Sequence, residues 1–439
     1  MADGVNHCTS LSGSDCSGTL RSVFCCSVYS RQSAMKKGSS DNVLESVFAA
    51  NPKYELVLFD RLPAEQREML KDLLKDPNFY GVLRPLEKSG LGVKSVSRDT
   101  ALLYLTLQQP GRLPAYVRAT LGDRCNQEIT RLVLDGVLAL EREGKFLSGS
   151  EAAALICAAK EESTATSTVE GFLERLSLDA LRYGQSLRLT DPMVLSSRLY
   201  GYNRTPLSPF WSRILPNADT VADYLGIREG SSRALLDREW SRVRNPAAND
   251  GWLAWQSRRL GTRAAFGDRA TIQCKLYISP KTDNLPQVFP LILAALSRTR
   301  VQHFKVGKDA PGLLRPDKMV AYFGSYNDLM DAAEQLKKEL GDCPAQGVPF
   351  TAELAGDGLL SWGVDPPAEE QALPWIGRES WRLWVTNRLA VALIAASTDN
   401  TANLEPWQFA LQRLQFEGVN TRSWTPAGTE RKPSLGEEN

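Results

Sequence analysis

The sequence predicts a multi-domain α+β (mixed α/β) protein, with an N-terminal winged-helix-like module, a helical middle and a small mixed-sheet domain with a helical end. The chain has 439 residues, which is too long for one ordinary hydrophobic core. Hydrophobic residues make up 43% and charged residues 23%, as in globular domains. Stretches with helical spacing and stretches rich in strand-forming residues follow one another in distinct blocks.

Composition excludes several classes of protein. The formal net charge is +1, so the whole surface has no bias toward nucleic acid or anionic membrane. No stretch reaches the 18 or more apolar residues that span a bilayer, and the N-terminus lacks the pattern of a secretory signal. Eight cysteines occur without CxxC spacing. We therefore expect a cytoplasmic protein with reduced cysteines and no membrane partner.

The histidine count narrows the chemistry further. The chain has only two histidines, His7 and His303, and His7 lies in a terminal tail. A zinc site or a two-histidine iron site would need a cluster of imidazoles. We therefore expect no metal site, and no organic cofactor is implied.

The two ends of the chain differ from the rest. Residues 1–41 are rich in Ser, Gly and Cys and show no periodicity, so they are predicted to be a disordered tail, with a true start near Met35. Residues 426–439 are polar and contain Pro and Gly, and are predicted to be a second disordered tail.

The first folded block, 42–159, has the element order of a winged helix. A strand is predicted at 54–59. Three short helices and a Gly-turned hairpin then follow. The third helix carries Arg131 together with Glu128 and Asp135, whose charges repel phosphate, so nucleic-acid binding is disfavoured. Peptide recognition and a structural role both remain open. A helix is predicted at Pro63–Lys75, the three short helices at Asp99–Leu107, Leu113–Leu121 and Asn126–Asp135, and the hairpin at 136–148.

The second block, 168–267, is predicted to be a helical domain. Arginines crowd its C-terminal half, where Trp240, Trp252 and Trp255 interleave with them. Such a mixture is able to bind single-stranded nucleic acid by stacking. Because Asp and Glu residues dilute the charge, a salt-bridged surface over buried tryptophans is the preferred interpretation.

The third block, 270–425, is predicted to be a mixed-sheet domain with a helical end. A strand at 271–279 places Lys275 and Tyr277 on one face, because side chains alternate along a strand. The remaining strands and helices of this block have strand-like or helix-like apolar spacing. They are predicted at 285–296 (helix), 302–306 and 318–323 (strands), 326–340 (helix), 348–354 (strand), 379–395 and 406–416 (helices).

Cationic side chains gather in three segments of this third block. Lys275 and Tyr277 share one strand face, and His303 and Lys305 share another. If the two strands are neighbours, these four groups converge. Arg315 and Lys318 follow a loop that contains Gly307 and Gly312, where the backbone can approach a ligand closely. Clustered cations of this kind predict a site for an anion such as phosphate.

The same residue types could perform an elimination reaction. A lysine that is partly buried and crowded by other cations has a lowered pKa and can act as a base. Tyr277 or His303 could supply a proton, and Arg315, Lys275 and Lys318 could hold a phosphate. A base, an acid and a phosphate clamp are the parts that β-elimination of phosphate from phosphoserine or phosphothreonine requires.

Three motifs carry a resemblance to a known family. The segments Ile272–Ser279 (IQCKLYIS), His303–Val306 (HFKV) and Arg315–Tyr322 (RPDKMVAY) resemble the core of the phosphothreonine lyases. That group includes the OspF/SpvC-type bacterial effectors and the lyase domains of lanthipeptide synthetases. The later segments Val348–Leu354 and Trp362–Pro367 are similar to HopA-type effector-like proteins, some of which are linked to dehydration of ribosomal peptides. The resemblance covers residues 272–367.

The resemblance implies a role for each matching residue. Lys305 matches the family's proposed α-proton base, Lys275 matches a substrate or phosphate contact, and Arg315 matches an arginine that grips phosphate. Tyr277 stands where the family has its general-acid histidine, so either Tyr277 or the nearby His303 takes that role. The implied partners are a phosphorylated peptide or protein substrate, held by the N-terminal module, and a separate kinase.

Two other functions are consistent with the sequence. A non-catalytic scaffold could bind a peptide or protein through the same surface, and a winged-helix protein could bind nucleic acid. The residues themselves also allow simpler interpretations. Lys275 and Lys305 could be exposed strand residues, and His303 a surface histidine. Arg315 and Asp317 could form a turn closed by a salt bridge.

Overall fold

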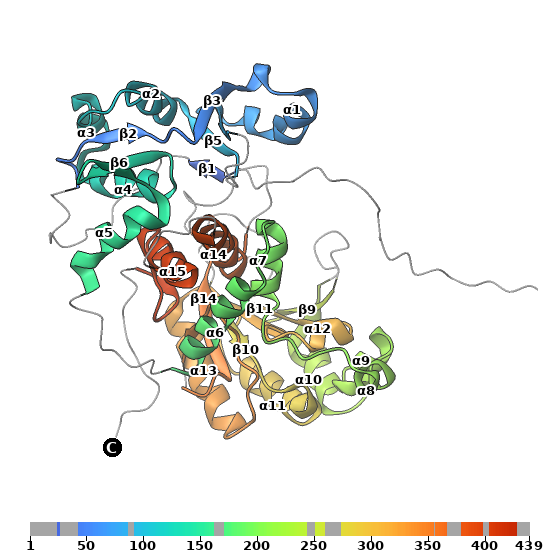
Figure 1. Cartoon of the computed structure of the whole chain (residues 1–439). Helices are drawn as coiled ribbons and strands as arrows, with labels where there is room; N and C mark the ends of the chain where they lie inside the picture. The colour runs from blue at the N-terminus through green and yellow to red at the C-terminus, as the bar shows by residue number, and fades with distance from the viewer. Residues whose placement is uncertain are drawn as a thin grey trace, which may run out of the picture.

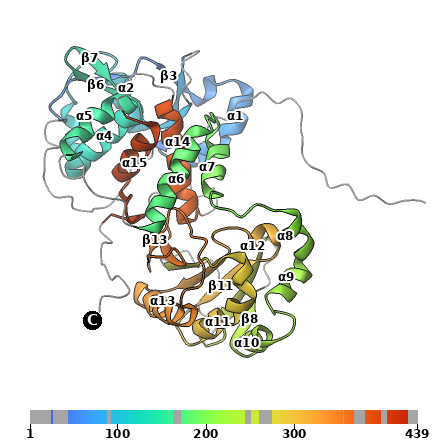
Figure 2. The same cartoon turned by 60° about the horizontal axis from the view of Figure 1, so that its bottom comes forward.

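The computed structural model is a mixed α+β structure, as the sequence predicts. It describes residues 43–86, 92–161, 171–243, 251–259, 274–354, 356–366, 379–397 and 404–427, and the backbone of Phe24–Cys26. Helices α6, α7, α14 and α15 lie between an N-terminal module and a large antiparallel sheet, which Figures 1 and 2 show from two directions. None of the helices in the described ranges is long and apolar enough to cross a membrane.

The N-terminal module contains the three helices and the hairpin that the sequence predicts. Its three-stranded sheet has the order β2-β6-β7. Phe48, Ile129, Val133 and Leu138 are fully buried between this sheet and the helices. The elements are β2 (Phe48–Ala50), α2 (Arg98–Thr106), α3 (Ala115–Leu121), α4 (Cys125–Leu134), β6 (Leu138–Arg142) and β7 (Lys145–Leu147).

A second sheet of the module was predicted only in part. Its order is β1-β5-β4-β3, and of these strands only β3 (Tyr54–Leu58) was expected. The strands β4 (Phe79–Pro85) and β5 (Lys94–Ser97) escaped prediction. The helix predicted from Pro63 to Lys75 begins at Ala64 as α1 (Ala64–Leu70) and tightens into a 3-10 helix, η3 (Lys71–Lys75).

Strand β1 (Phe24–Cys26) lies within the N-terminal stretch that was predicted to be disordered. Its backbone pairs in parallel with β5, so the prediction is wrong at these three residues, because composition alone does not report a strand that an existing sheet edge recruits. The rest of residues 1–41 and residues 428–439 lie outside the described residues.

The helices of the predicted middle domain divide between two hydrophobic cores. Helices α6 (Phe172–Ser186) and α7 (Pro192–Tyr200) pack against α14 (Trp381–Ser397) and α15 (Pro406–Phe416). Trp381 and Trp384 are buried in this group and stack with ring centres 5.4 Å apart. Asp191 begins α7 by accepting hydrogen bonds from the backbone N–H groups of Met193 and Val194. Helix α5 (Gly149–Glu161) joins the group to the N-terminal module.

The remaining helices of the middle block belong to the core of the large sheet. They lie next to α11 and α13 on the apolar side of the sheet. These helices of the middle block are α8 (Pro209–Ile214), α9 (Ala218–Tyr224) and α10 (Ser231–Glu239). The third block contributes α11 (Leu285–Ser297), α12 (Ala310–Leu313) and α13 (Tyr326–Leu340) to the same core.

The large sheet has seven strands, all antiparallel, in the order β13-β14-β10-β12-β11-β9-β8. The sequence predicted β10, β11 and β12. It did not predict β8, β9 or β14, and the strand expected at 348–354 is reduced to two residues. The strands are β8 (Trp240–Arg242), β9 (Trp252–Ser257), β10 (Cys274–Ile278), β11 (His303–Gly307), β12 (Met319–Phe323), β13 (Ala352–Glu353) and β14 (Leu360–Val364). Near the end of the described part of the chain, β15 (Val419–Asn420) and β16 (Thr425–Pro426) form a two-stranded antiparallel sheet.

The two faces of the large sheet differ in chemistry. On β10, Cys274, Leu276 and Ile278 face the apolar core that α11 and α13 cover. Lys275 and Tyr277 alternate with them and face the opposite side. Helices α7 and α14 approach this second face, which carries the predicted functional residues.

Candidate functional site: a cationic sheet face

Strand register brings the predicted site residues onto one face of the sheet. Lys275 on β10 lies opposite Tyr322 on β12, and Tyr322 lies opposite His303 on β11. Tyr277 and Lys305 both lie opposite Val320 in the same way. The strands β10 and β11 are not neighbours, because β12 lies between them, and the register nevertheless places these side chains on the same face of the sheet. We call this surface the cationic face.

Tyr322 is the centre of the cationic face. The His303 imidazole stacks on its ring, with ring centres 4.1 Å apart and planes 19° from parallel. The Lys275 ammonium lies 5.8 Å and the Lys305 ammonium 5.6 Å from the centre of the same ring. The cations are therefore arranged around a π surface that attracts positive charge. The sequence analysis did not include Tyr322 among the site residues.

Lys305 lies against an aromatic ring rather than against a carboxylate. Its ammonium lies 4.3 Å from the centre of the Trp252 ring, and it makes no ion pair with any residue in the described ranges. Burial lowers the pKa of Lys305 to about 8, with Asp317 raising it and Arg315 lowering it to smaller extents. A lysine of this kind is partly neutral near neutral pH and can accept a proton.

Arg315 is anchored by a carboxylate and two aromatic rings. Its Nε and Nη2 donate to the two oxygens of Asp317 at 2.9 and 2.8 Å. Its guanidinium lies 4.8 Å from the centre of the Trp252 ring, and its Nη2 donates to the Tyr200 hydroxyl at 3.2 Å. The turn with a salt bridge is thus present, and it holds Arg315 beside Lys305.

Asp317 joins Arg315 to the helical group. Tyr200 on α7 donates its hydroxyl to Oδ2 of Asp317 at 3.0 Å, and Nη1 of Arg382 on α14 lies 2.8 Å from the same oxygen. Burial opposes ionisation of Asp317, but the Arg382 and Arg315 charges outweigh it and hold its pKa below the ordinary value. Arg382 is fully buried and also donates to the Pro349 carbonyl.

Lys275 is held by Asp365, which follows β14. The two side chains form an ion pair, and they are 10% and 4% exposed respectively. Asp365 is not among the residues that the sequence predicts for the site, and the structure places its carboxylate beside Lys275 on the cationic face. The position of Lys275 is therefore fixed by a partner that sequence spacing did not reveal.

The two candidate proton donors are both neutral at neutral pH. Burial, together with the smaller effects of the Lys305 and Lys275 charges, lowers the pKa of His303 to about 3. Burial raises the pKa of Tyr277 well above its ordinary value. His303 is therefore an uncharged imidazole, whereas Tyr277 keeps its phenolic proton throughout the physiological range.

Lys318 and the glycines of the Arg315 loop serve the fold. Lys318 is fully buried, donates to the Pro280 carbonyl at 2.8 Å and to Gln346 at 2.5 Å, and burial lowers its pKa to about 7. A Cβ added to Gly307 would lie 2.3 Å from the carbonyl carbon of Gly312. These two glycines allow β11 and α12 to approach each other.

Comparison with known proteins yields fold-level similarity only. No protein-family profile matches the chain, and no curated protein matches it. The structure is similar to an effector protein from Pseudomonas syringae pv. syringae strain 61, with a TM-score of 0.35 and 13% sequence identity, over 58% of this chain and 98% of that chain. An effector protein from Pseudomonas syringae pv. tomato strain DC3000 gives a TM-score of 0.35 and 11% identity, over 58% of this chain and 99% of that chain. The function is therefore argued from the residues of the site.

Several residues of the site come from positions that motif spacing did not select. Trp252 lies on β9, which pairs with β11, and the sequence analysis placed it in the helical block. Tyr200 and Arg382 come from helices far from the sheet in sequence. Arg382 could have been selected because it is a charged residue within an apolar helix. Such a charge needs a buried carboxylate partner.

The features that suggested nucleic-acid binding are used for packing. Trp240 and Trp255 are buried in the sheet core, 2% and 3% exposed, and cannot act as stacking platforms. On α4, Asp135 accepts a hydrogen bond from Arg413, and Gln127 donates to the Phe416 carbonyl. Helix α15 thus covers part of the helix that would enter a DNA groove. In the described parts of the chain, no group of three or more His, Cys, Asp or Glu side chains is arranged to hold a metal ion.

Proposed function

We propose that the cationic face eliminates phosphate from phosphoserine or phosphothreonine in a peptide. The observation that best supports the proposal is the environment of the Lys305 amine. This amine is half-buried, forms no ion pair with the described residues, and has a pKa of about 8. It therefore has the properties of a general base. The other cations, Lys275 and Arg315, are fixed on either side of it.

In this reaction the neutral amine of Lys305 removes the α-proton of the phosphorylated residue. The electron pair of the broken C–H bond forms the Cα–Cβ double bond, and the Cβ–O bond to phosphate breaks. The products are a dehydroamino acid in the peptide and inorganic phosphate. Lys275 and Arg315 would stabilise the charge that accumulates on the departing phosphate.

The proton donor in this proposal is a phenol. His303 would have to be protonated to act as a strong acid, and its pKa of about 3 leaves it neutral. Tyr277 keeps its proton at pH values where Lys305 has lost its own. A neutral base and a protonated acid are thus available together. We assign proton donation to Tyr277. His303 instead supports the Tyr322 ring, on which it stacks.

A second candidate function is binding of a phosphopeptide without chemistry. It is favoured by the two ion pairs of the site, because Lys275 and Arg315 already have the carboxylates Asp365 and Asp317 as partners. A cation that is already paired stabilises the additional negative charge of a departing phosphate less than a lone cation does, which disfavours the elimination step. This alternative predicts binding of phosphopeptide and no release of phosphate.

The test is a single experiment on the full chain. A synthetic phosphothreonine peptide is incubated with the protein, and free phosphate and peptide mass are followed together. The proposal expects equal amounts of free phosphate and of peptide lighter by one phosphoric acid. A phosphatase would instead leave threonine, and a binding protein would leave the phosphopeptide intact. Either result would overturn the proposal.

The control variant replaces a lysine that lies outside the site. Lys305→Met is expected to abolish release, whereas Lys281→Met replaces an exposed lysine that follows the end of β10 and is expected to leave it unchanged. Equal loss in both variants would show that the effect is not specific to the cationic face.

A further inference from the structure

The guanidinium group of Arg315 is held in one orientation by residues from the sheet and from the helical group. Asp317 accepts hydrogen bonds from its Nε and Nη2 at 2.9 and 2.8 Å, and the Tyr200 hydroxyl accepts a second one from Nη2 at 3.2 Å. The Trp252 ring lies against the flat face of the group. Nη1 makes no hydrogen bond with any residue that the structure describes. Its two N–H groups therefore have a fixed direction and are available to a ligand.

Asp317 and Tyr200 are themselves held by Arg382 of helix α14. Nη1 of Arg382 lies 2.8 Å from Oδ2 of Asp317, and its Nη2 donates to the backbone carbonyl of Tyr200 at 2.8 Å. Its guanidinium also lies 4.4 Å from the centre of the Tyr200 ring. One fully buried side chain of the helical group thus fixes both of the residues that orient Arg315.

Arg382 also changes how strongly Arg315 attracts an anion. Asp317 carries one negative charge, and the guanidinium groups of Arg315 and Arg382 both face it. The three side chains together therefore keep one positive charge. The Arg382 side chain is 0% exposed, whereas that of Arg315 is 20% exposed, so a ligand reaches this charge at Arg315. Arg315 thus retains more attraction for an anion than it would in a simple ion pair.

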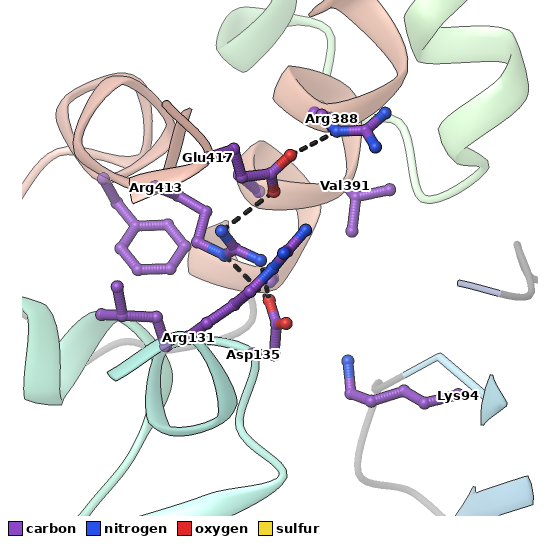
Figure 3. Close-up of a pocket in the computed structure, with 11 residues that line it drawn as sticks. Lys94, Arg131, Asp135, Arg388, Val391, Arg413 and Glu417 are labelled. Atoms are coloured by element: carbon purple, nitrogen blue, oxygen red, sulfur yellow. Dashed lines mark hydrogen bonds and ion pairs between the residues drawn. The ribbon is translucent and has the colours of Figure 1, made fainter. Parts of the chain in front are cut away.

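Helix α14 is held at a second point by a network of ion pairs, which Figure 3 shows. Arg388, less than two helical turns beyond Arg382, pairs with Glu417. Arg413 on α15 lies 2.9 Å from the other carboxylate oxygen of Glu417, and it donates to Asp135 at the end of α4 at 2.8 Å. The helix that carries Arg382 is therefore connected to the N-terminal module as well as to the sheet.

We propose that Tyr200 and Arg382 are positioning residues, which act through Asp317 to aim Nη1 of Arg315 at the phosphate of the substrate, and that helix α14 connects this arrangement to the N-terminal module. The inference rests on the proposed function, because it takes a phosphorylated residue as the ligand of the cationic face. A guanidinium binds phosphate oxygens through N–H groups of fixed geometry, so an error in their direction weakens binding. A displacement of α14 would reach Arg315 through Arg382.

The Tyr200 hydroxyl allows a sharp test, because it can be removed without the ring. Tyr200→Phe keeps the ring and the backbone carbonyl, both of which contact Arg382. It removes the hydrogen bonds with Asp317 and Arg315. The matched control is Tyr224→Phe on α9, which removes a hydroxyl that donates to a backbone carbonyl at 3.0 Å and lies by the core of the large sheet, away from the cationic face.

The test measures binding to the full chain by titration calorimetry. The ligand is a peptide with the phosphonate analogue of phosphothreonine, in which a CH₂ group replaces the bridging oxygen and prevents elimination. The same peptide with threonine is the reference. Tyr200→Phe is expected to weaken binding of the phosphonate peptide about tenfold, the effect of one disturbed charge-assisted hydrogen bond, and to leave binding of the threonine peptide unchanged. Tyr224→Phe is expected to change neither.

Asp135→Asn tests the connection to the N-terminal module. It removes one charge from the network of Figure 3 and leaves Arg413 its pair with Glu417. A smaller loss of affinity for the phosphonate peptide, about threefold, is therefore expected. In the Tyr200→Phe background the same change should have no further effect, because both act through the orientation of Arg315. Asp123→Asn, at an exposed position of the same module, is expected to change nothing.

Each result decides one part of the proposal. The positioning role is overturned if the parent chain does not prefer the phosphonate peptide, or if Tyr200→Phe binds it as tightly as the parent or weakens both peptides equally. Unchanged binding in Asp135→Asn would overturn the connection through α14. Phosphate release from the phosphothreonine peptide is measured on the same samples. A parent chain that prefers the phosphonate peptide and releases no phosphate would refute elimination while the orientation of Arg315 toward phosphate still stands.

Discussion

The Lys305 ammonium lies 4.3 Å from the centre of the Trp252 ring, and the Arg315 guanidinium lies 4.8 Å from the same ring. The indole thus contacts two cations whose charges repel each other. Its π face stabilises the charged form of Lys305, whereas burial and Arg315 favour the neutral form. The result is an amine with a pKa of about 8, about a tenth of which is neutral at pH 7.

Removal of the Lys305 amine should abolish elimination and leave the fold intact. Lys305→Met keeps most of the apolar stem, so the packing against Trp252 is retained. Loss of a general base lowers the rate by about 10²- to 10⁴-fold. Phosphate release under single-turnover conditions measures the effect. Lys305→Arg keeps the charge but cannot act as a base, so activity in that variant would assign the base elsewhere.

The rate of elimination should rise with pH. Lys305 must be neutral to accept the α-proton, so kcat/KM is expected to increase about tenfold per pH unit below its pKa. The increase should level off near pH 8, the pKa of Lys305. A pH profile on one phosphothreonine peptide gives the inflection. A profile that is flat between pH 6 and 9 would contradict the assignment of Lys305 as base.

Asp317 should be far more important for stability than an exposed aspartate. Asp317→Asn removes the charge that compensates Arg315 and the fully buried Arg382, and a buried charge left without its partner costs about 3–5 kcal/mol. Asp237→Asn is the matched control, because Asp237 pairs with Arg233 on the surface of α10. That pair contributes at most about 1 kcal/mol. Urea unfolding of the two variants compares them, and equal losses would contradict the central role of Asp317.

The sequence predicted the local pairs of the site better than its long-range partners. Alternation along β10 and β11 was enough to place Lys275 with Tyr277 and His303 with Lys305. The intervening strand β12 was also predicted, but its Tyr322 was not selected as a site residue. Tyr322 is only 8% exposed and nevertheless contacts three site residues.

No local sequence pattern identified the residues from distant segments that contact the site residues. Asp365 pairs with Lys275 across 90 positions of sequence, and Tyr200 reaches Asp317 across 117. The first contact depends on the pairing of β14 with β10, and the second depends on how helix α7 docks on the sheet. Periodicity specifies neither. The strand β9 escaped prediction for another reason. Its burial pattern shows Leu253, Ala254 and Trp255 buried in succession, without the alternation that marks a half-buried strand.

His303 should make the folded state sensitive to acid. Its pKa is about 3 in the folded chain and about 6.5 in an unfolded one. Between these two values the unfolded chain binds a proton that the folded chain does not. The free energy of unfolding contributed by this group is therefore complete above pH 6.5 and falls as the pH is lowered, by at most about 1.4 kcal/mol per pH unit.

The matched variant for this effect is His303→Gln, which keeps a polar side chain and removes the titration. All other titrating groups are shared with the parent chain, so the difference between the two unfolding curves isolates His303. The curve of His303→Gln should be the flatter one between pH 6.5 and 4.5. Parallel curves over that range would mean that the imidazole can be protonated in place, and His303 would then become available as an acid beside Lys305.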